Sequence, residues 1–184
     1  VLESKKGPTV SNLSSTRALR DITEAKGLNY YTAAVGEVNV TTKMREVGAV
    51  IGGEGNGGVI FPELHYGRDA YMGIALFLSN MARKRMKATE LRATYPPYYI
   101  SKNRIELSDK NLIDKIFTFV KKKYSNEKIT DIDGVKIDFD SRRSWVHLRK
   151  SNTEPIIRVY SEAPTIEQAD TLAKMIIADI NKQL

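Results

Sequence analysis

Two loops concentrate the residues that could bind a polar ligand. The first is the glycine-rich run 52–58, which carries one carboxylate, Glu54, and one amide, Asn56. A carboxylate accepts hydrogen bonds and an amide both donates and accepts them, so hydroxyl groups suit both. The surrounding glycines let a ligand approach the main chain closely. The run therefore predicts a site for a hydroxyl-rich ligand, and the alternative that remains is a plain glycine hairpin.

The same run fits the pattern G-x-G-x-x-G at Gly53, Gly55 and Gly58. A dinucleotide site requires a helix directly after this pattern, because the helix N-terminus holds the pyrophosphate. Residues 59–62 read Val-Ile-Phe-Pro, which indicates a strand. The run also lacks the Gly-Lys-Ser/Thr ending of a nucleotide-binding P-loop. The glycines are thus predicted to form a tight turn between two strands.

The second loop reads Arg-Lys-Ser-Asn-Thr-Glu-Pro-Ile-Ile-Arg over residues 149–158. Two guanidinium groups flank a Ser-Asn-Thr turn that Pro155 ends. Hydroxyl, amide and backbone N–H groups can converge on a tetrahedral dianion, and arginine adds charge-assisted, bidentate hydrogen bonds. The loop is predicted to bind phosphate, and an ordinary turn with solvated arginines stays an equal alternative on residue types alone.

A short acidic segment resembles a site for a hard cation: Asp131, Asp133, Asp138 and Asp140. A calcium loop of the helix–loop–helix type would need an oxygen ligand at its fifth position and a glutamate at its twelfth. Counted from Asp131, these positions hold Val135 and Arg142. The alternation of apolar residues from Val135 onward instead predicts a turn that enters an amphipathic strand, so no metal site is expected.

Neither histidine lies in a spacing typical of metal ligands. His147 stands between Val146 and Leu148 and is predicted to be a packing or surface residue of a strand. His65 is expected in a polar loop after the glycine-rich strand. It is a candidate for the same pocket as Glu54.

Composition narrows the function classes further. The chain has 184 residues, no Cys and a formal net charge of +7. The missing cysteines exclude disulfides, thiolate metal sites and a cysteine nucleophile. The positive charge is spread along the chain, which argues against a nucleic-acid-binding arm and fits any small anionic partner. Apolar runs too short for a membrane span and a start without a signal-peptide pattern predict a cytoplasmic protein with no membrane partner.

Residues 1–88 alternate between helix-like and strand-like segments. Helices are predicted over residues 14–26, 38–47 and 69–87, and strands over 28–35, 49–51 and 59–61. Such alternation is typical of an α/β protein, here a partial, N-terminally incomplete α/β/α layered domain. The start Val1-Leu2 resembles the end of an interrupted element and leads us to expect a piece of a longer protein.

A different pattern follows a predicted linker. Pro96 and Pro97 disfavour a helix at and before them, so residues 89–97 are expected to be a hinge. Residues 98–184 predict strands over 98–107, 132–139, 145–149 and 156–160, and helices over 109–124 and 165–184. Thr165 and Gln168 suit the start of the last helix. The second part is thus predicted to be a small α+β domain with an antiparallel sheet and two helices.

Taken together, the two loops resemble those of the α-D-phosphohexomutase family, which includes phosphoglucosamine mutase, phosphomannomutase and phosphoglucomutase. The glycine-rich run is similar to the sugar-binding loop of the family's domain 3, and residues 149–155 are similar to the phosphate-binding loop of domain 4. Three further segments support the resemblance: residues 35–37, 66–69 and 133–137. It spans nearly the whole chain and implies that residues 1–88 and 98–184 correspond to domains 3 and 4.

The resemblance also implies residue roles. Glu54, helped by Asn56 and Gly58, would bind the sugar hydroxyls, and Glu37 and His65 are candidates for the same pocket. The phosphate that is not being transferred would be gripped by Arg149, Ser151, Asn152 and Thr153, with Arg158 as a weaker candidate. The implied partner is a phosphorylated hexose or hexosamine.

Family members move a phosphoryl group between C6 and C1 through a phosphoserine and a bisphosphorylated sugar. The phosphoserine loop and the Asp-Gly-Asp-x-Asp-Arg loop that holds Mg²⁺ are not found in this sequence, and in the family both lie in domains 1 and 2. The resemblance therefore implies missing N-terminal domains that carry catalysis and Mg²⁺. It also implies no catalytic residue or metal ligand in this chain, which is expected to be inactive alone.

The Glu-Gly-Asn-Gly-Gly sequence over residues 54–58 favours a phosphoglucosamine mutase. An acidic Glu37 could attract a protonated 2-amino group, which would agree with that substrate. Two alternatives stay open: a phosphomannomutase or phosphoglucomutase, and a non-catalytic module that binds sugar phosphates.

Overall fold

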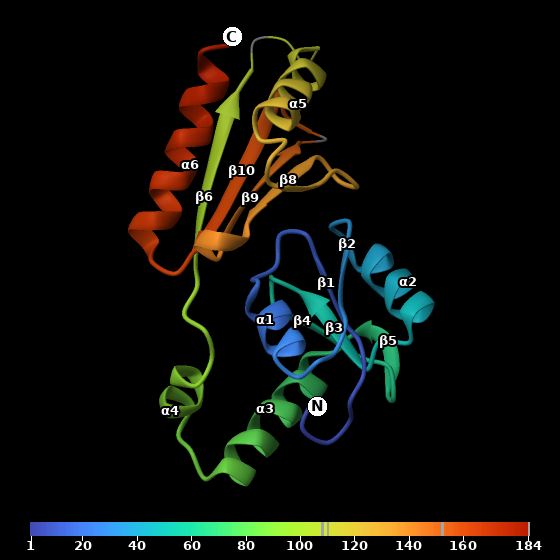
Figure 1. Ribbon diagram of the computed structural model, residues 1–184. Helices are drawn as coiled ribbons and strands as arrows, with labels where there is room; N and C mark the ends of the chain where they lie inside the picture. The colour runs from blue at the N-terminus through green and yellow to red at the C-terminus, as the bar shows by residue number, and fades with distance from the viewer. Residues whose placement is uncertain (108, 110, 152, 184) are drawn as a thin grey trace. The chain divides into compact units, whose positions relative to one another are not determined.

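The computed structural model describes residues 1–107, 109, 111–151 and 153–183. The chain divides into two compact units, residues 1–97 and 98–184. Each unit has one five-stranded sheet and its own hydrophobic core (Figure 1).

The first unit is a mixed sheet with helices. Its strands stand in the order β2-β1-β3-β4-β5, in which β1 runs parallel to β2 and β3, while β4 runs antiparallel to β3 and β5. The elements are β1 (Thr9–Asn12), α1 (Ala18–Glu24), β2 (Tyr30–Ala33), α2 (Glu37–Val47), β3 (Ile51–Glu54), β4 (Gly58–Phe61), β5 (His65–Arg68), α3 (Ala70–Lys84) and α4 (Ala88–Ala93).

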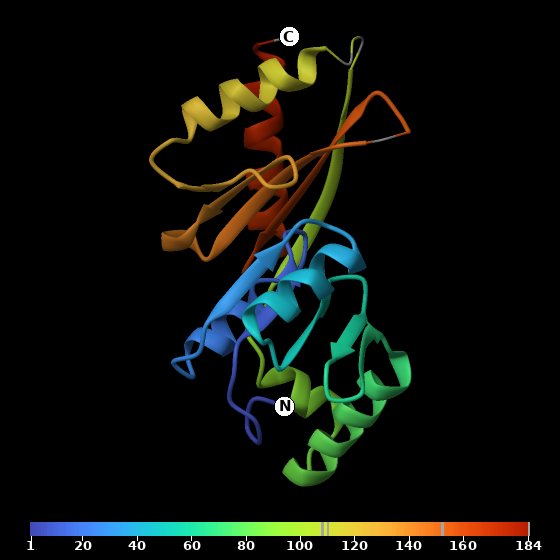
Figure 2. The same ribbon diagram turned by 90° about the vertical axis from the view of Figure 1, so that its right-hand side faces the viewer.

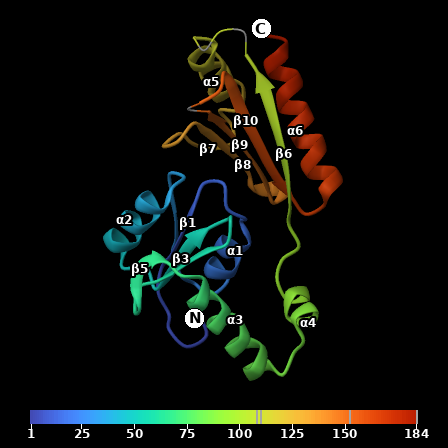
Figure 3. The ribbon, with the colours of Figure 1, turned by 180° about the vertical axis from the view of Figure 1, so that it is seen from behind.

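Helices α1 and α2 lie on opposite sides of β1 and β3 (Figures 1 and 3). Val40 and Met44 of α2 are fully buried and pack with Val10 of β1 and Ile60 of β4 in one core cluster. The spacing of Val40 and Met44, one helical turn apart, is what places both side chains on the sheet side of α2. The predicted α/β layering of this part is thus confirmed.

The second unit is an antiparallel sheet in the order β6-β10-β9-β8-β7, with two helices. Residues of α5 and α6, yellow and red in Figure 2, belong to one core cluster together with alternate residues of the strands, so both helices cover the same face. This is the predicted α+β domain. The elements are β6 (Tyr99–Glu106), α5 (Leu112–Lys123), β7 (Lys128–Thr130), β8 (Val135–Phe139), η1 (Asp140–Arg142), β9 (Ser144–Lys150), β10 (Ile156–Ala163) and α6 (Ile166–Asn181).

Side chains that alternate with this core point to the other face of the sheet. There Trp145 Nε1 donates a 2.9 Å hydrogen bond to Glu162 Oε1, and Lys136 Nζ lies 4.5 Å from the centre of the Trp145 ring. His147 neighbours this group, and its Nε2 lies 2.6 Å from the Asp133 carbonyl oxygen. His147 is only 2% exposed. It is a packing residue, one of the two roles that the sequence predicted.

Burial makes His147 a source of acid sensitivity. Desolvation is the largest cause that lowers the pKa of His147, from 6.5 to about 4. Between these values the unfolded chain binds more protons than the folded one, so stability present above pH 6.5 is lost as the pH falls towards 4. We expect the free energy of unfolding to fall by about 3 kcal/mol over this range. Urea unfolding at several pH values measures it.

His147→Gln should flatten that dependence between pH 7 and pH 5, where carboxylates contribute little. His65→Gln serves as the matched control, because the His65 side chain is 50% exposed. An unchanged pH dependence in His147→Gln would contradict the assignment.

The structure differs from the sequence prediction in several elements. The predicted hinge over residues 89–97 contains α4, because the prolines act only on the residues next to them and the helix ends at Ala93. The Glu90 carboxylate accepts the Lys87 backbone N–H at 2.7 Å and so supports the first turn of α4. Strands β1, β5 and β7 were not predicted, since each is short and has a single apolar or aromatic residue, too few for a recognisable apolar pattern. The start of α6 is as predicted, with Gln168 N donating to Thr165 Oγ1 at 3.2 Å.

Within the described part of the chain, no helix combines the length and the apolar character that crossing a bilayer demands.

Candidate functional site

The glycine-rich run forms the hairpin between β3 and β4. Glu54 is the last residue of β3 and pairs with Gly58, the first residue of β4. Gly57 has a φ of 96° and donates its N–H to the Glu54 carbonyl oxygen at 3.1 Å, which closes the turn. A positive φ at this place favours glycine over other residues. The predicted tight turn between two strands is confirmed.

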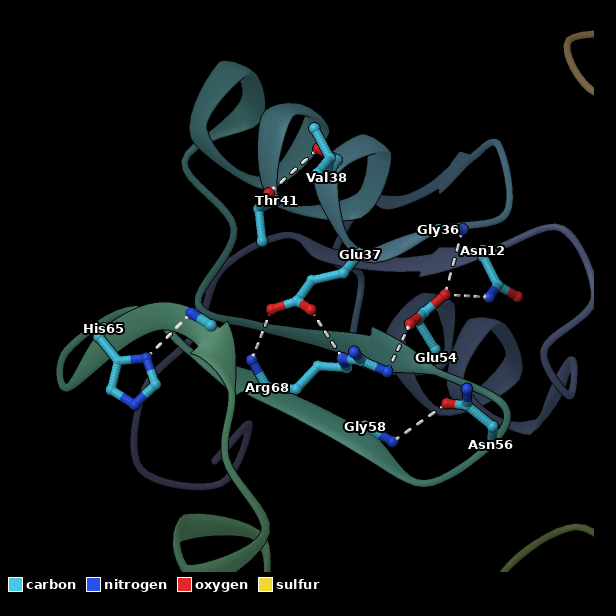
Figure 4. Close-up of polar contacts among 11 residues, drawn as sticks. Asn12, Gly36, Glu37, Val38, Thr41, Glu54, Asn56, Gly58, His65 and Arg68 are labelled. Atoms are coloured by element: carbon cyan, nitrogen blue, oxygen red, sulfur yellow. Dashed lines mark hydrogen bonds and ion pairs between the residues drawn. The ribbon is translucent and has the colours of Figure 1, made fainter.

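The Glu54 carboxylate is held in place rather than projecting into solvent. Its Oε1 accepts hydrogen bonds from Asn12 Nδ2 at 3.0 Å and from Gly36 N at 3.2 Å (Figure 4). Asn12 ends β1, the strand beside β3, and Gly36 precedes α2. The Glu54 side chain is only 5% exposed. Three separate segments of the fold thus converge on one carboxylate and hold its Oε1 atom.

The second oxygen of Glu54 faces Arg68, which is the last residue of β5 in the next hairpin of the sheet. Arg68 Nη1 lies 3.6 Å from Glu54 Oε2, too long for a hydrogen bond but within ion-pair distance. Among the described residues, none donates a hydrogen bond to Oε2. This oxygen therefore keeps its capacity to accept a hydrogen bond from a ligand hydroxyl.

Glu37 binds Arg68 with both of its oxygens. Oε2 accepts from Arg68 Nε at 2.8 Å, and Oε1 accepts from the Arg68 backbone N–H at 3.0 Å (Figure 4). The backbone hydrogen bond and, after it, the side-chain hydrogen bond from Arg68 lower the pKa of the Glu37 carboxyl. Glu37, Arg68 and Glu54 form a chain of alternating charges, which we call the Glu–Arg–Glu chain.

The remaining candidates of this unit lie at its edge. Asn56 is exposed in the turn, and its Oδ1 accepts from Gly58 N at 3.4 Å. His65 belongs to β5 rather than to the predicted polar loop, and its Nε2 lies 3.0 Å from Asp69 Oδ2. Figure 4 places Glu37 and Arg68 between His65 and Glu54. A direct role of His65 beside Glu54 stays a prediction.

The arginine-containing loop is the hairpin between β9 and β10. Ser151 closes it by donating its N–H to the Ile156 carbonyl oxygen at 3.0 Å. The Ser151 hydroxyl lies 3.4 Å from that of Thr153 and accepts from Glu154 N at 3.4 Å. Two hydroxyl groups thus stand at the exposed end of the hairpin, while Asn152 lies outside the described residues.

Arg149 is oriented by an aspartate from the acidic segment. Its Nε lies 2.9 Å from both Asp133 Oδ1 and Oδ2, and the Arg149 side chain is 30% exposed. The terminal nitrogen atoms of Arg149 make no hydrogen bond with the residues that the structure describes. Such an anchored guanidinium can offer two N–H donors to a phosphate at little entropic cost.

The acidic segment therefore supports the arginine. Asp131 pairs with Lys121 Nζ at 3.2 Å, and Asp133 pairs with Arg149. In the described ranges no three His, Asp or Glu side chains are grouped so as to hold a metal ion.

Three arginines stand in one row across the second sheet. The register pairs Arg149 of β9 with Arg158 of β10, and Arg158 with Arg104 of β6. Residues that pair directly share a face of the sheet, and like charges placed this way repel one another. Asp133 compensates Arg149, and Glu106 lies 3.0 Å from Arg104. No ion pair joins Arg158 to the described residues, so a bound anion would relieve the repulsion there.

Comparison with known proteins decides the family. The model of phosphoglucomutase/phosphomannomutase, alpha/beta/alpha domain III, matches residues 1–98, and that of the C-terminal domain of the same family matches residues 104–179. The chain belongs to the phosphoglucomutase/phosphomannomutase family. The resemblance of the two loops to α-D-phosphohexomutases is thereby confirmed.

Two individual relatives agree with this family assignment. A phosphoglucomutase/phosphomannomutase of Thermococcus kodakarensis is 38% identical over 165 residues, 89% of this chain and 35% of the relative. A phosphoglucosamine/phosphogalactosamine mutase of Sulfurisphaera tokodaii is 33% identical over 168 residues, 89% of this chain and 36% of the relative. The chain thus spans little more than a third of these relatives.

Solved structures show the same fold. A phosphoglucomutase/phosphomannomutase family protein of Burkholderia thailandensis has a TM-score of 0.79 at 24% identity, over 99% of this chain and 39% of that one. An N-acetylphosphoglucosamine mutase of Aspergillus fumigatus, solved with GlcNAc-6P and magnesium, has a TM-score of 0.65 at 18% identity, over 97% of this chain and 39% of that one.

Four residues that contact Glu54 or Arg149 were not predicted as site residues from the sequence: Asn12, Gly36, Arg68 and Asp133. Their positions far from the loops in sequence gave no local pattern. Only the pairing of β1 with β3 and the turn before β8 bring Asn12 and Asp133 to their partners. The partial signals were the segments 35–37, 66–69 and 133–137, which contain Gly36, Arg68 and Asp133 and supported the family resemblance without a role for these residues.

Proposed function

We infer that this chain is the sugar- and phosphate-binding part of a phosphohexomutase that interconverts hexose 6-phosphates and hexose 1-phosphates. The observation that carries the proposal is the anchored Arg149 beside the exposed hydroxyls of Ser151 and Thr153. Arginine and two hydroxyls are donors that suit a phosphate dianion. Glu54, fixed with one oxygen available, supplies the acceptor that a sugar hydroxyl needs.

The names of the relatives do not agree on one substrate class. The relatives include both a phosphoglucomutase/phosphomannomutase and a phosphoglucosamine/phosphogalactosamine mutase. We propose a hexosamine phosphate, on the Glu-Gly-Asn-Gly-Gly loop sequence. Glu37 does not add to this argument, because both of its oxygens already bind Arg68. Hexose phosphates of glucose or mannose are the alternative.

The remaining chemistry is assigned to other parts of the parent polypeptide. We propose that the phosphoserine and the Mg²⁺ site lie in N-terminal domains absent from this chain. The A. fumigatus relative was solved with magnesium, which supports Mg²⁺ as a cofactor of the proposed enzyme. The metal would supply charge neutralisation during phosphoryl transfer. Residues of this chain would bind and orient the sugar phosphate, on which phosphoryl-transfer catalysis largely depends.

An NMR titration of the 184-residue chain tests the binding proposal. Four ligands are compared: glucosamine 6-phosphate, glucose 6-phosphate, inorganic phosphate and glucosamine. We expect the two sugar phosphates to shift the amide signals of Ser151 and Thr153 and also those around Glu54. Inorganic phosphate should shift only the former. Saturable shifts at neither loop with millimolar sugar phosphate would contradict the proposal.

A non-catalytic sugar-phosphate-binding module is the second candidate. Its binding titrations would look the same, so activity must separate the two. The product of the complete reading frame, incubated with glucosamine 6-phosphate, a trace of the bisphosphorylated sugar and Mg²⁺, should produce the 1-phosphate, which ³¹P NMR resolves. Binding without conversion would favour the module.

A further inference from the structure

Arg68 is not assigned to the sugar site by the proposed function, and yet it is the residue that links the two carboxylates beside the glycine-rich hairpin. We propose that Arg68 is the positioning residue that orients the Glu54 carboxylate, and that Glu37 acts on sugar binding through Arg68. The inference deepens the proposed function and rests on it for the role of Glu54.

The first step is the asymmetry of the Glu54 carboxylate. Two N–H donors, Asn12 Nδ2 and Gly36 N, meet at Oε1, while Oε2 faces, among the residues that the structure describes, only the Arg68 guanidinium at 3.6 Å. The donors at Oε1 fix one oxygen, but the carboxylate plane can still rotate about that contact. A cation placed on the side of Oε2 selects one orientation electrostatically. The Glu54 side chain is 5% exposed and the Arg68 side chain 48%, so solvent screens this attraction from the side of the arginine only.

The second step is the anchoring of Arg68 itself. Glu37 takes the Arg68 Nε and the Arg68 backbone N–H, one with each oxygen, so the arginine is held at two points (Figure 4). A long side chain that is fixed at its base and at Nε has few rotamers left for its terminal nitrogens. Glu37 thereby sets where Nη1 stands opposite Glu54. Lysine could not reproduce this arrangement, since it has neither Nε–H nor a planar fork.

The absence of a side chain at Gly58 leaves space for Arg68. A Cβ atom at this residue would lie 2.6 Å from Arg68 Cδ and 3.0 Å from Cγ, so the arginine stem crosses the strand where β4 has no side chain. Gly58 was predicted to bind the sugar. In the structure, a side chain at this position would collide with Arg68. We therefore assign to Gly58 the role of leaving room for the Arg68 side chain.

The experiment compares Arg68→Met with Arg68→Lys in the 184-residue chain and has one readout that needs no ligand. The Gly36 amide and the Asn12 side-chain amide donate to Glu54 Oε1, so their proton shifts report the carboxylate. We expect both signals to move upfield in Arg68→Met and to be restored only partly in Arg68→Lys. Unchanged signals in Arg68→Met would overturn the inference, whatever the ligand does.

The second readout is affinity. Glucosamine 6-phosphate should bind about tenfold more weakly to Arg68→Met, the loss expected for about one hydrogen bond. Inorganic phosphate, which needs only the Arg149 hairpin, should bind within twofold of the unmodified chain. An equal loss for both ligands would mean general destabilisation and would also overturn the inference.

Glu37→Gln and Gly58→Ala complete the series. Glutamine retains one acceptor and should cause a smaller shift of the Gly36 amide than Arg68→Met does. Gly58→Ala must displace the Arg68 stem and should move the same two amide signals. If the unmodified chain binds no sugar phosphate, the proposed function fails, while the amide signals still decide whether Arg68 positions Glu54.

Discussion

Replacing Arg149 by alanine is expected to weaken the binding of phosphate to the β9–β10 hairpin by about a hundredfold. The guanidinium can form two charge-assisted hydrogen bonds with a phosphate, each contributing about 1.5 kcal/mol or more. Its orientation costs little on binding because Asp133 already holds Nε at 2.9 Å. Titration of inorganic phosphate and of glucose 6-phosphate, followed at the Ser151 and Thr153 amides, measures the loss.

Arg149→Lys should recover only a small part of the affinity. A lysine ammonium can pair with Asp133 or with the phosphate, but it lacks the fork that serves both at once. Arg158→Ala is the matched control, since it removes the same charge from the neighbouring strand without the Asp133 anchor. Equal losses in Arg149→Ala and Arg158→Ala would show that the Asp133 anchor gives Arg149 no advantage over Arg158, the weaker candidate, and would contradict the prediction.

Gly134→Ala is expected to destabilise the second unit by about 3 kcal/mol or more. Gly134 has a φ of 76°, and a Cβ there would lie 2.1 Å from the carbonyl oxygen of Leu148. Side chains avoid this backbone conformation, and a contact with main-chain atoms cannot be relieved by a rotamer change. The turn before β8 or the strand β9 must move. Denaturant unfolding of the variant, monitored by Trp145 fluorescence, gives the change.

The matched control for this substitution is Gly27→Ala in the first unit, and its unfolding is followed by circular dichroism, because Trp145 belongs to the second unit. Gly27 has a similar φ of 68°, but a Cβ there meets no atom within 4 Å. It should cost only about 1–2 kcal/mol, the conformational penalty alone. Gly134→Ala should also weaken phosphate binding, because the added Cβ presses on Leu148 and Arg149. A cost no larger than that of Gly27→Ala would contradict the steric argument.

Local patterns were sufficient to predict the long elements and both hairpins. The helix α2 and the strand β9 have clear apolar periodicity, and the glycines around Glu54 require a turn whatever surrounds them. Family resemblance was needed to assign the loops to sugar and phosphate, because residue types alone left a plain turn as an alternative. The helix α4 was not predicted, because Pro96 and Pro97 were taken to disfavour a helix over residues 89–97, whereas they affect only the residues next to them.

What could not be predicted were the contacts between distant segments. Asp133 belongs to an acidic run whose composition suggested a cation, and its pairing with Arg149 depends on the register of β8 and β9. Likewise, Glu54 was predicted to accept hydrogen bonds from a ligand, but that Asn12 and Gly36 already donate to one of its oxygens could not be predicted. Such pairings follow from tertiary register, which no short segment encodes.

Each hairpin is carried by a sheet that has its own core: one cluster is built around Met44 and Ile60, the other around Leu148 and Ile176. The residues that pack beneath Glu54 and those that pack beneath Arg149 therefore belong to two different clusters. Under the proposed function, substitutions around Glu54 could change the sugar preference while the core that supports the Arg149 hairpin keeps its sequence.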